Sequence, residues 1–311
     1  MIDIPEISVE SLQRHHTILY PSVRVRATKA LGSGTVIYSK PEDPDGLPDE
    51  FETLVLTNHH VVADLIEVKE DWDSGLQRKR YREFRSPAMV EFFEFKRHSR
   101  VVSTNGKEAK VLAWDDKLDL ALLRLETVAE SPYVARLCPA ERFERGIFTF
   151  DRVFTVGAAL GEDPVVTEGR VAQFDRKIDA EPYLLTTAPS IFGNSGGAVY
   201  LLDTEELIGV PARIAVAGFG NAVTHLSYSI PITTVYRFLE EKDFQYIFDP
   251  DFTSKQCAAT RERKLRASRD AQARPPDVND PENRAQGGMV PPFPYGPDED
   301  EGRPDGTASV V

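Results

Sequence analysis

The stretch Gly193-Asn194-Ser195-Gly196-Gly197-Ala198 decides how the rest of the chain is interpreted. A serine hydroxyl is a weak nucleophile unless a base takes its proton, and its attack on a carbonyl creates an oxyanion that needs donors already in place. Glycines beside a serine permit a tight backbone that points several N–H groups into one small hole. We therefore expect Ser195 to be a nucleophile, with the backbone at Gly193, Asn194 and Ser195 forming an oxyanion hole.

The same stretch also fits two other interpretations. Gly-Asn-Ser-Gly-Gly is also good turn chemistry, with no catalytic meaning. The string further fits G-x-S-x-G, the nucleophile elbow of α/β-hydrolases, which requires a helix after the serine and then an Asp and a His. The apolar run 198–202 favours a strand instead, and the only histidine that follows is His225. The elbow interpretation is therefore set aside.

Composition limits the classes of function. The chain has 311 residues, enough for one large or two medium domains, and its net charge of −13 argues against nucleic acid as a partner. No run approaches the roughly 18 apolar residues of a membrane span. The first residues show neither a basic nor an apolar leader region, so we expect a cytoplasmic location. Two cysteines indicate no disulfide framework, and the paired histidines lack spaced ligands, so we expect no metal and no cofactor.

The first half of the chain predicts strands and a candidate base. Val23 and Val25 alternate with arginines, and the apolar run 53–56 leads into Thr57-Asn58-His59-His60-Val61-Val62. Together with Gly32-Ser33-Gly34, taken as a turn, this string resembles the start of trypsin-like proteases of the high-temperature-requirement (HtrA) type. Their pattern Thr-Asn-x-His-Val-Val carries the general base. The resemblance assigns that role to His60.

A candidate carboxylate follows. Asp119 is predicted to lie inside an apolar strand, where a carboxylate is costly unless something partners it. A capped strand start is the structural alternative. Asp119-Leu120-Ala121-Leu122-Leu123 resembles the string that carries the triad aspartate in the same family. The resemblance implies that Asp119 orients His60.

The order His60, Asp119, Ser195 is that of the chymotrypsin-type double barrel, and the resemblance covers roughly residues 23–240. It implies an all-β fold of two six-stranded antiparallel β-barrels of chymotrypsin type, with a short C-terminal helix. We expect barrels at 1–135 and 136–246. A charged bridge and disordered tail are expected at 247–311, since residues 271–311 contain 8 Pro and 5 Gly. No PDZ domain follows, although Ser309-Val310-Val311 is a weak match to a PDZ ligand.

The expected substrate pocket departs from that of the trypsins. Pro189, six residues before the serine, replaces their Asp, so selection for Lys or Arg is not expected. Pro211, Ala212 and Arg213 are expected to form the pocket wall. We favour an outward Arg213, which predicts cleavage after small or medium aliphatic residues. An inward Arg213 would instead admit acidic residues.

Two local expectations concern the first barrel. Residues 64–88 are interpreted as an insertion whose basic run 77–85 favours a solvated surface helix over contact with RNA or an acidic partner. Residues 101–111 are predicted to form a hairpin that turns at Asn105-Gly106.

The sequence therefore predicts a serine endopeptidase that acts on a protein or peptide through an acyl-enzyme. Two alternatives remain: a non-enzymatic binding module on the same fold, and a protease dedicated to itself or one partner. The sequence does not indicate an oligomeric state.

Overall fold

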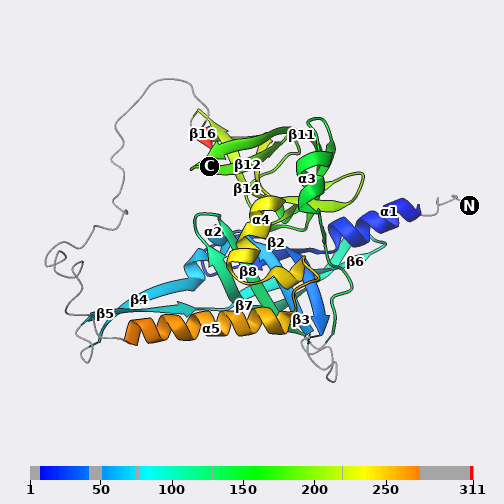
Figure 1. The fold of residues 1–311 in the computed structure, drawn as a ribbon. Coiled ribbons are helices and arrows are strands. Elements are labelled where there is room, and N and C mark those ends of the chain that lie inside the picture. Colours follow the sequence, from blue (N-terminus) through cyan, green and yellow to red (C-terminus); the bar gives the residue numbers. More distant parts are fainter. Residues whose placement is uncertain are drawn as a thin grey trace, which may run out of the picture.

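The computed structural model describes residues 8–41, 51–73, 78–127, 129–218, 220–273 and 309–310. In the part of the chain so described, strands dominate and pair almost entirely antiparallel. Figure 1 shows two bodies of sheet, one from the blue-to-teal half of the chain and one from the green-to-yellow half, with helix α4 at their junction. The predicted all-β fold of chymotrypsin type is confirmed.

Six of the described strands close the first barrel in the order β1-β2-β3-β8-β7-β6. Their bounds are β1 Ser22–Arg26, β2 Leu31–Pro41, β3 Phe51–Thr57, β6 Ala88–Lys96, β7 Arg100–Asp115 and β8 Leu120–Thr127. The predicted alternation in β1 holds only in part: Val23 and Val25 are fully buried and Arg26 is exposed, but Arg24 is buried as well. Alternation follows from the pleat, which sends successive side chains to opposite faces.

The second barrel is closed by the pairing of β13 with β14, which joins the ends of the described path β13-β10-β11-β12-β15-β14. Its strands are β10 Arg152–Gly157, β11 Val165–Ile178, β12 Glu181–Thr186, β13 Ala198–Leu201, β14 Glu206–Ala217 and β15 Asn221–Pro231. Two short strands add to β14: β9 (Arg136–Leu137) in parallel, and β16 (Ser309–Val310) antiparallel.

Helices join and cover the barrels. Their bounds are α1 Val9–Arg14, followed by a π-helical segment His15–Leu19; α2 His59–Val62; α3 Ala140–Gly146; α4 Ile232–Glu241; and α5 Ser254–Ala273. Single 3₁₀ turns occur at Ala63–Leu65, Ala159–Gly161 and Gln245–Ile247. The amphipathic α4 is the predicted short C-terminal helix, and its apolar face is buried. None of the described helices is both long and apolar enough to cross a membrane.

The insertion is a β-hairpin, so the predicted surface helix is wrong. Strands β4 (Ile66–Asp73) and β5 (Arg78–Arg85) pair in an unbroken antiparallel register, with Asp71 opposite Arg80. Asp71 and Asp73 of β4 lie opposite Arg80 and Arg78 of β5, and opposite charges across a strand pair favour pairing. Figure 1 shows this hairpin extending beyond the first barrel.

Two predicted turns are also wrong. Asn105-Gly106 lies within the continuous strand β7, and the chain reverses instead at Arg97 and His98, both with positive φ. Gly32-Ser33-Gly34 lies within β2, where a Cβ on Gly32 would collide with the Val61 side chain and approach the Ser195 carbonyl. The charged bridge is the helix α5, and the predicted disordered tail lies outside the described residues except at its two ends.

Candidate active site

His60 and Asp119 form the first contact of the site. The His60 Nδ1 lies 2.8 Å from Asp119 Oδ2 and 3.0 Å from Oδ1, and the His60 backbone N–H donates to Oδ1 at 3.0 Å. An ionised carboxylate only accepts hydrogen bonds, so this contact places the ring proton on Nδ1. The lone pair of Nε2 is then left to accept a proton.

The Asp119 backbone explains how a carboxylate is held here. Asp119 lies in the turn just before β8, not inside the strand as predicted, and its φ is +52°. Left-handed backbone is uncommon outside glycine, although aspartate adopts it more readily than most residues. The buried Asn58 side chain donates to the Asp119 carbonyl at 2.8 Å, which fixes the turn. Asp119 is itself largely buried, and its carboxylate accepts from the His60 ring and backbone.

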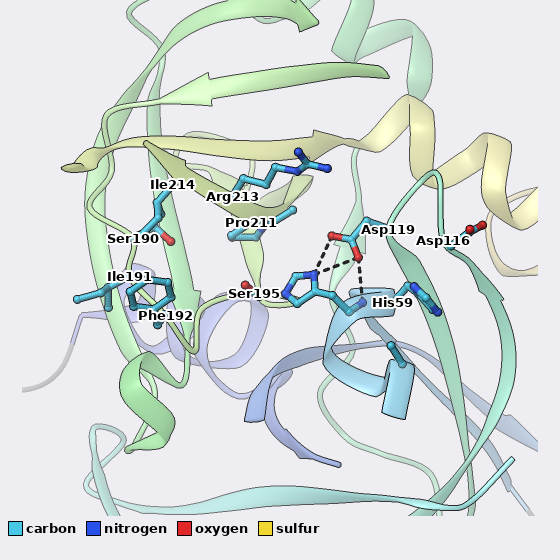
Figure 2. Close-up of a pocket in the computed structure, with 13 residues that line it drawn as sticks. His59, Asp116, Asp119, Ser190, Ile191, Phe192, Ser195, Pro211, Arg213 and Ile214 are labelled. Carbon is cyan, nitrogen blue, oxygen red and sulfur yellow. Dashed lines mark hydrogen bonds and ion pairs between the residues drawn. The ribbon is translucent and has the colours of Figure 1, made fainter. Parts of the chain in front are cut away.

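Ser195 faces the same cavity as His60 and Asp119, a cleft of about 600 Å³. Figure 2 shows Ser195 beside the imidazole that is bonded to Asp119, on the side of the ring away from the carboxylate. The three residues come from different elements: His60 from α2, Asp119 from the turn before β8, and Ser195 from the loop before β13. The structure therefore brings together the three residues that the sequence singled out.

The backbone around Ser195 leaves two N–H groups without a backbone partner among the described residues. The Asn194 N–H donates to the Ile191 carbonyl at 3.0 Å, which closes a turn with Gly193 at φ +95°. The Phe192 carbonyl accepts from the Leu160 N–H at 2.7 Å. In a trans peptide the N–H and C=O point in opposite directions, so the Gly193 N–H points away from Leu160.

The oxyanion hole therefore has fewer candidate donors than the three that the sequence predicts. Among the described residues, the Gly193 and Ser195 N–H groups donate no backbone hydrogen bond, whereas the Asn194 N–H is used within the turn. Asn194 therefore does not contribute a free donor. A Cβ at Gly193 would lie 2.5 Å from the Ala158 carbonyl, so this position tolerates only glycine.

Ser33 connects the first barrel to the segment between β12 and β13 that carries Ser195, residues 187–197, called the serine loop below. Its Oγ donates to the Gly193 carbonyl at 2.6 Å and accepts from the Ala158 N–H at 2.7 Å, and its N–H donates to the Ser195 carbonyl at 2.8 Å. The side chain is fully buried. The sequence around Ser33 predicts only a turn and does not indicate this role, because all three partners are more than a hundred residues away along the chain.

Arg24 of the first barrel holds a second segment, residues 158–162, whose Leu160 N–H positions the Phe192 carbonyl. Leu160 has φ +54°, a strained conformation for a leucine. The nearly buried Arg24 of β1 donates to the carbonyls of Gly161 at 2.7 Å and Glu162 at 3.3 Å, and its guanidinium also pairs with Glu91. The first barrel therefore fixes this segment as well as the serine loop.

His59 lies beside the site without bonding to Asp119. Its ring stacks on Trp114 with centroids 5.0 Å apart and an interplanar angle of 20°. Burial lowers the pKa of the His59 imidazole below its ordinary value, against the opposing effect of Asp119 and Asp116. The contact to Asp119 thus distinguishes the two adjacent histidines in favour of His60.

The cleft has a different base from the one predicted. Pro189 is exposed and does not line it, and its carbonyl accepts from the Thr167 hydroxyl at 2.7 Å. Ser190, which is buried, takes the lining position one residue later. The predicted wall is present, and Ile191, Phe192 and Ile214 add to its apolar surface. A register error of one residue in a loop is beyond what sequence spacing can resolve.

Arg213 lines the cleft, but its charge is already paired. Its guanidinium lies 2.7 Å from Asp179 Oδ2 and over the ring of Tyr183, 5.6 Å from the centroid. Asp179 stands in the turn between β11 and β12. Neither of the two predicted orientations describes this arrangement fully, because the stem faces the cleft while the charged head is held at its edge.

The family can now be assigned. Residues 32–210 match the sequence profile described as the trypsin-like peptidase domain. The chain belongs to this family. The matched range contains His60, Asp119 and Ser195, the residues that the site brings together.

Curated relatives are similar over most of this chain. A probable periplasmic serine endoprotease DegP-like of Pseudomonas fluorescens is 26% identical over 212 residues, covering 67% of this chain and 34% of the relative. Its counterpart in Pseudomonas fulva is 28% identical, covering 68% and 34%. The periplasmic pH-dependent serine endoprotease DegQ of Escherichia coli is 26% identical, covering 68% and 42%. The chain thus spans about a third of the length of the first two and about two fifths of DegQ.

Solved structures agree on the fold. The HtrA-type protease AlgW with tripeptide aligns with a TM-score of 0.53 at 19% identity, over 77% of this chain and 64% of that one. Deg5 aligns with a TM-score of 0.50 at 20% identity, over 75% and 94%. The resemblance to HtrA-type proteases is confirmed, and at these identities the structural likeness shows the fold alone.

The expected cytoplasmic location is wrong. The three curated relatives are all named as periplasmic proteases. The expectation rested on the lack of an apolar leader in the first residues, and location is not a property that the fold encodes.

Proposed function

We propose that this protein is a serine endopeptidase that cleaves peptide bonds through an acyl-enzyme. The observation that carries the proposal is the Asp119–His60 contact at 2.8 Å, in a cleft that Ser195 also lines. Membership of the trypsin-like peptidase family supports it. We further propose that the barrels divide the chain at about residue 135, with the cleft between them, and that the protein acts in the periplasm, as its relatives' names indicate.

The proposed reaction has two halves, acylation of Ser195 and hydrolysis of the acyl-enzyme, and His60 acts in each half as base and then as acid. The Ser195 Oγ attacks the substrate carbonyl while His60 Nε2 takes its proton, and the carbonyl π electrons move to oxygen. The N–H groups of Gly193 and Ser195 hold that oxyanion. When the oxyanion re-forms the carbonyl, the C–N bond breaks and His60 gives its proton to the leaving amine. Water then attacks the acyl-serine with His60 again as base, releasing the acid and restoring Ser195.

Asp119 acts through His60. Its carboxylate holds the Nδ1 proton and stabilises the imidazolium that forms during attack. The turn that carries Asp119 is fixed by Asn58, so the ring begins each cycle already oriented.

We propose that the residue before the cut is small or medium and aliphatic. Ile191, Ile214, Pro211 and Ala212 supply apolar surface, and Ser190 places no carboxylate at the position where a cation would need one. Burying an unpaired Lys or Arg there would cost several kcal/mol, about 3 or more. Apolar pockets discriminate by only about 1–3 kcal/mol per methylene, so a preference is expected rather than strict selection.

Cleavage-site mapping tests this proposal. A denatured protein mixture is incubated with the wild-type protein and with Ser195→Ala, and new termini are identified by mass spectrometry. The proposal expects cuts after Val, Ala or Leu that are absent with Ser195→Ala. Cuts mostly after Lys or Arg would contradict the proposed pocket, and the same cuts with both proteins would contradict the nucleophile.

A further inference from the structure

In the described part of the chain, one edge of β14 has no strand paired with it at residues 212–214, beside the active site. Strand β15 pairs with β14 along one edge from Gly209 to Ala217. On the other edge β13 pairs only at Leu207 and Gly209, and the Pro211 carbonyl accepts from the Gly196 N–H at 3.0 Å. The next residues, 212–214, line the cleft. Such an edge offers unpaired N–H and C=O groups to an extended peptide.

The chain's own C-terminal residues pair with β14 just beyond this open stretch. Strand β16 is antiparallel to β14, with Ser309 opposite Val216 and Val310 opposite Ala215. Because β15 takes the first edge over the same residues, β16 must lie on the edge that is open at residues 212–214. Figure 1 shows β16 beside β14 in the upper body of sheet.

The direction of β16 matters as much as its position. From Ser309 to Val310 the chain runs from Val216 toward Ala215, and hence toward residues 214–212 and the serine loop. A substrate strand that pairs with this edge in the same direction places the residues N-terminal to its cleavage site along β14. Its reacting carbonyl then lies toward Ser195. Strand β16 therefore has the polarity of the N-terminal part of a substrate.

We propose that Ser309–Val310 occupies the outer part of the edge to which long substrates must bind, so that this chain competes with its own substrates. The inference rests on the proposed peptidase function. Antiparallel pairing is one residue to one residue, so a peptide with about two residues before the cut ends near Arg213, whereas one with about six covers Ala215 and Val216. The tail thus excludes long peptides and leaves short ones unaffected.

Kinetics with two peptide lengths test the competition. The full chain is compared with a variant that lacks residues 309–311, on substrates with about two and about six residues before the same cut. If the tail fills the edge between about two thirds and nine tenths of the time, its removal lowers KM for the long peptide roughly three- to tenfold. KM for the short peptide and kcat for both stay the same. Val310→Thr, which keeps the backbone, behaves as the full chain.

Hydrogen exchange tests the pairing without activity. Amide exchange at Ala215 and Val216 is measured in Ser195→Ala with and without residues 309–311. Faster exchange after the deletion, independent of protein concentration, supports the proposal. Equal exchange, or protection that grows with concentration and so comes from a second copy, overturns it, as does an equal KM for the long peptide. If no variant cleaves any peptide, the proposed peptidase function fails while the exchange result still decides the pairing.

Discussion

Replacing Ser33 by alanine should damage catalysis more than stability alone explains. The Ser33 hydroxyl bonds two backbone groups of the second barrel, the Gly193 carbonyl at 2.6 Å and the Ala158 N–H at 2.7 Å. Gly193 carries one proposed oxyanion donor. Ala158 begins the segment in which the Leu160 N–H holds the Phe192 carbonyl.

The expected loss of stability and of kcat follows from the two backbone groups that Ser33→Ala leaves without a hydrogen-bond partner. Two buried backbone groups lose their partner, at about 1–3 kcal/mol each if nothing moves. Part of this cost can be relieved if the serine loop shifts, and a shift misplaces the Gly193 N–H. Removing an oxyanion donor outright costs about 10²–10³-fold in kcat, so a displaced donor should cost roughly 10–10²-fold. We expect KM to change less than about threefold, because the cleft walls stay in place.

Ser39→Ala is the matched control. Ser39 lies on the same strand β2, is also buried, and its Oγ likewise has two partners, the Thr53 hydroxyl and the Ser131 N–H, each at 2.8 Å. Both variants should lower the melting temperature to a similar degree, and only Ser33→Ala should lower kcat. Equal kcat values in the two variants, or a Ser33→Ala kcat within about twofold of the wild type, would refute the argument.

Three further predictions follow from the site. His60→Ala should lower kcat by about 10⁴-fold or more while His59→Ala keeps most activity, and a peptidase assay in which His59→Ala is the inactive variant contradicts the assignment. The lowered pKa of His59 means that its contribution to stability is complete above the ordinary histidine value of about 6.5 and is lost as pH falls through the lower folded value. His59→Phe keeps a ring on Trp114, so its melting temperature should fall less between about pH 7 and pH 5 than that of the wild type. An equal fall in both proteins would contradict a lowered pKa of His59. Asp179→Asn removes the carboxylate that holds the Arg213 guanidinium. Cleavage-site mapping should then show more cuts in peptides with an acidic residue on the N-terminal side of the cut. An unchanged cleavage profile would mean that Arg213 takes no part in substrate recognition.

The three proposed catalytic residues could be predicted because each is carried by a short local string. Thr57-Asn58-His59-His60 and Gly193-Asn194-Ser195 state the residue type and its backbone setting within a few positions. Their order along the chain also indicates the double barrel. These strings do not indicate the contacts that align the three residues with one another.

Those contacts join distant segments. Ser33 and Gly193 are 160 residues apart, and nothing near Ser33 in the sequence indicates a hydroxyl that bridges two barrels. The insertion was misinterpreted for a related reason. The basic run alone predicts a helix, whereas the structure pairs it as β5 with β4, where Asp71 and Asp73 lie opposite Arg80 and Arg78. Cross-strand neighbours override local propensity, and they become visible only when both strands are considered together.

The most direct test of the account is covalent labelling by a fluorophosphonate, which reacts with an activated serine hydroxyl. The wild-type protein should be labelled at Ser195 alone, as located by peptide mass spectrometry, and labelling should fall sharply in His60→Ala and in Asp119→Asn. No label on the folded wild-type protein, label on another serine, or label on Ser195 that is equally fast without His60 would contradict the proposed triad.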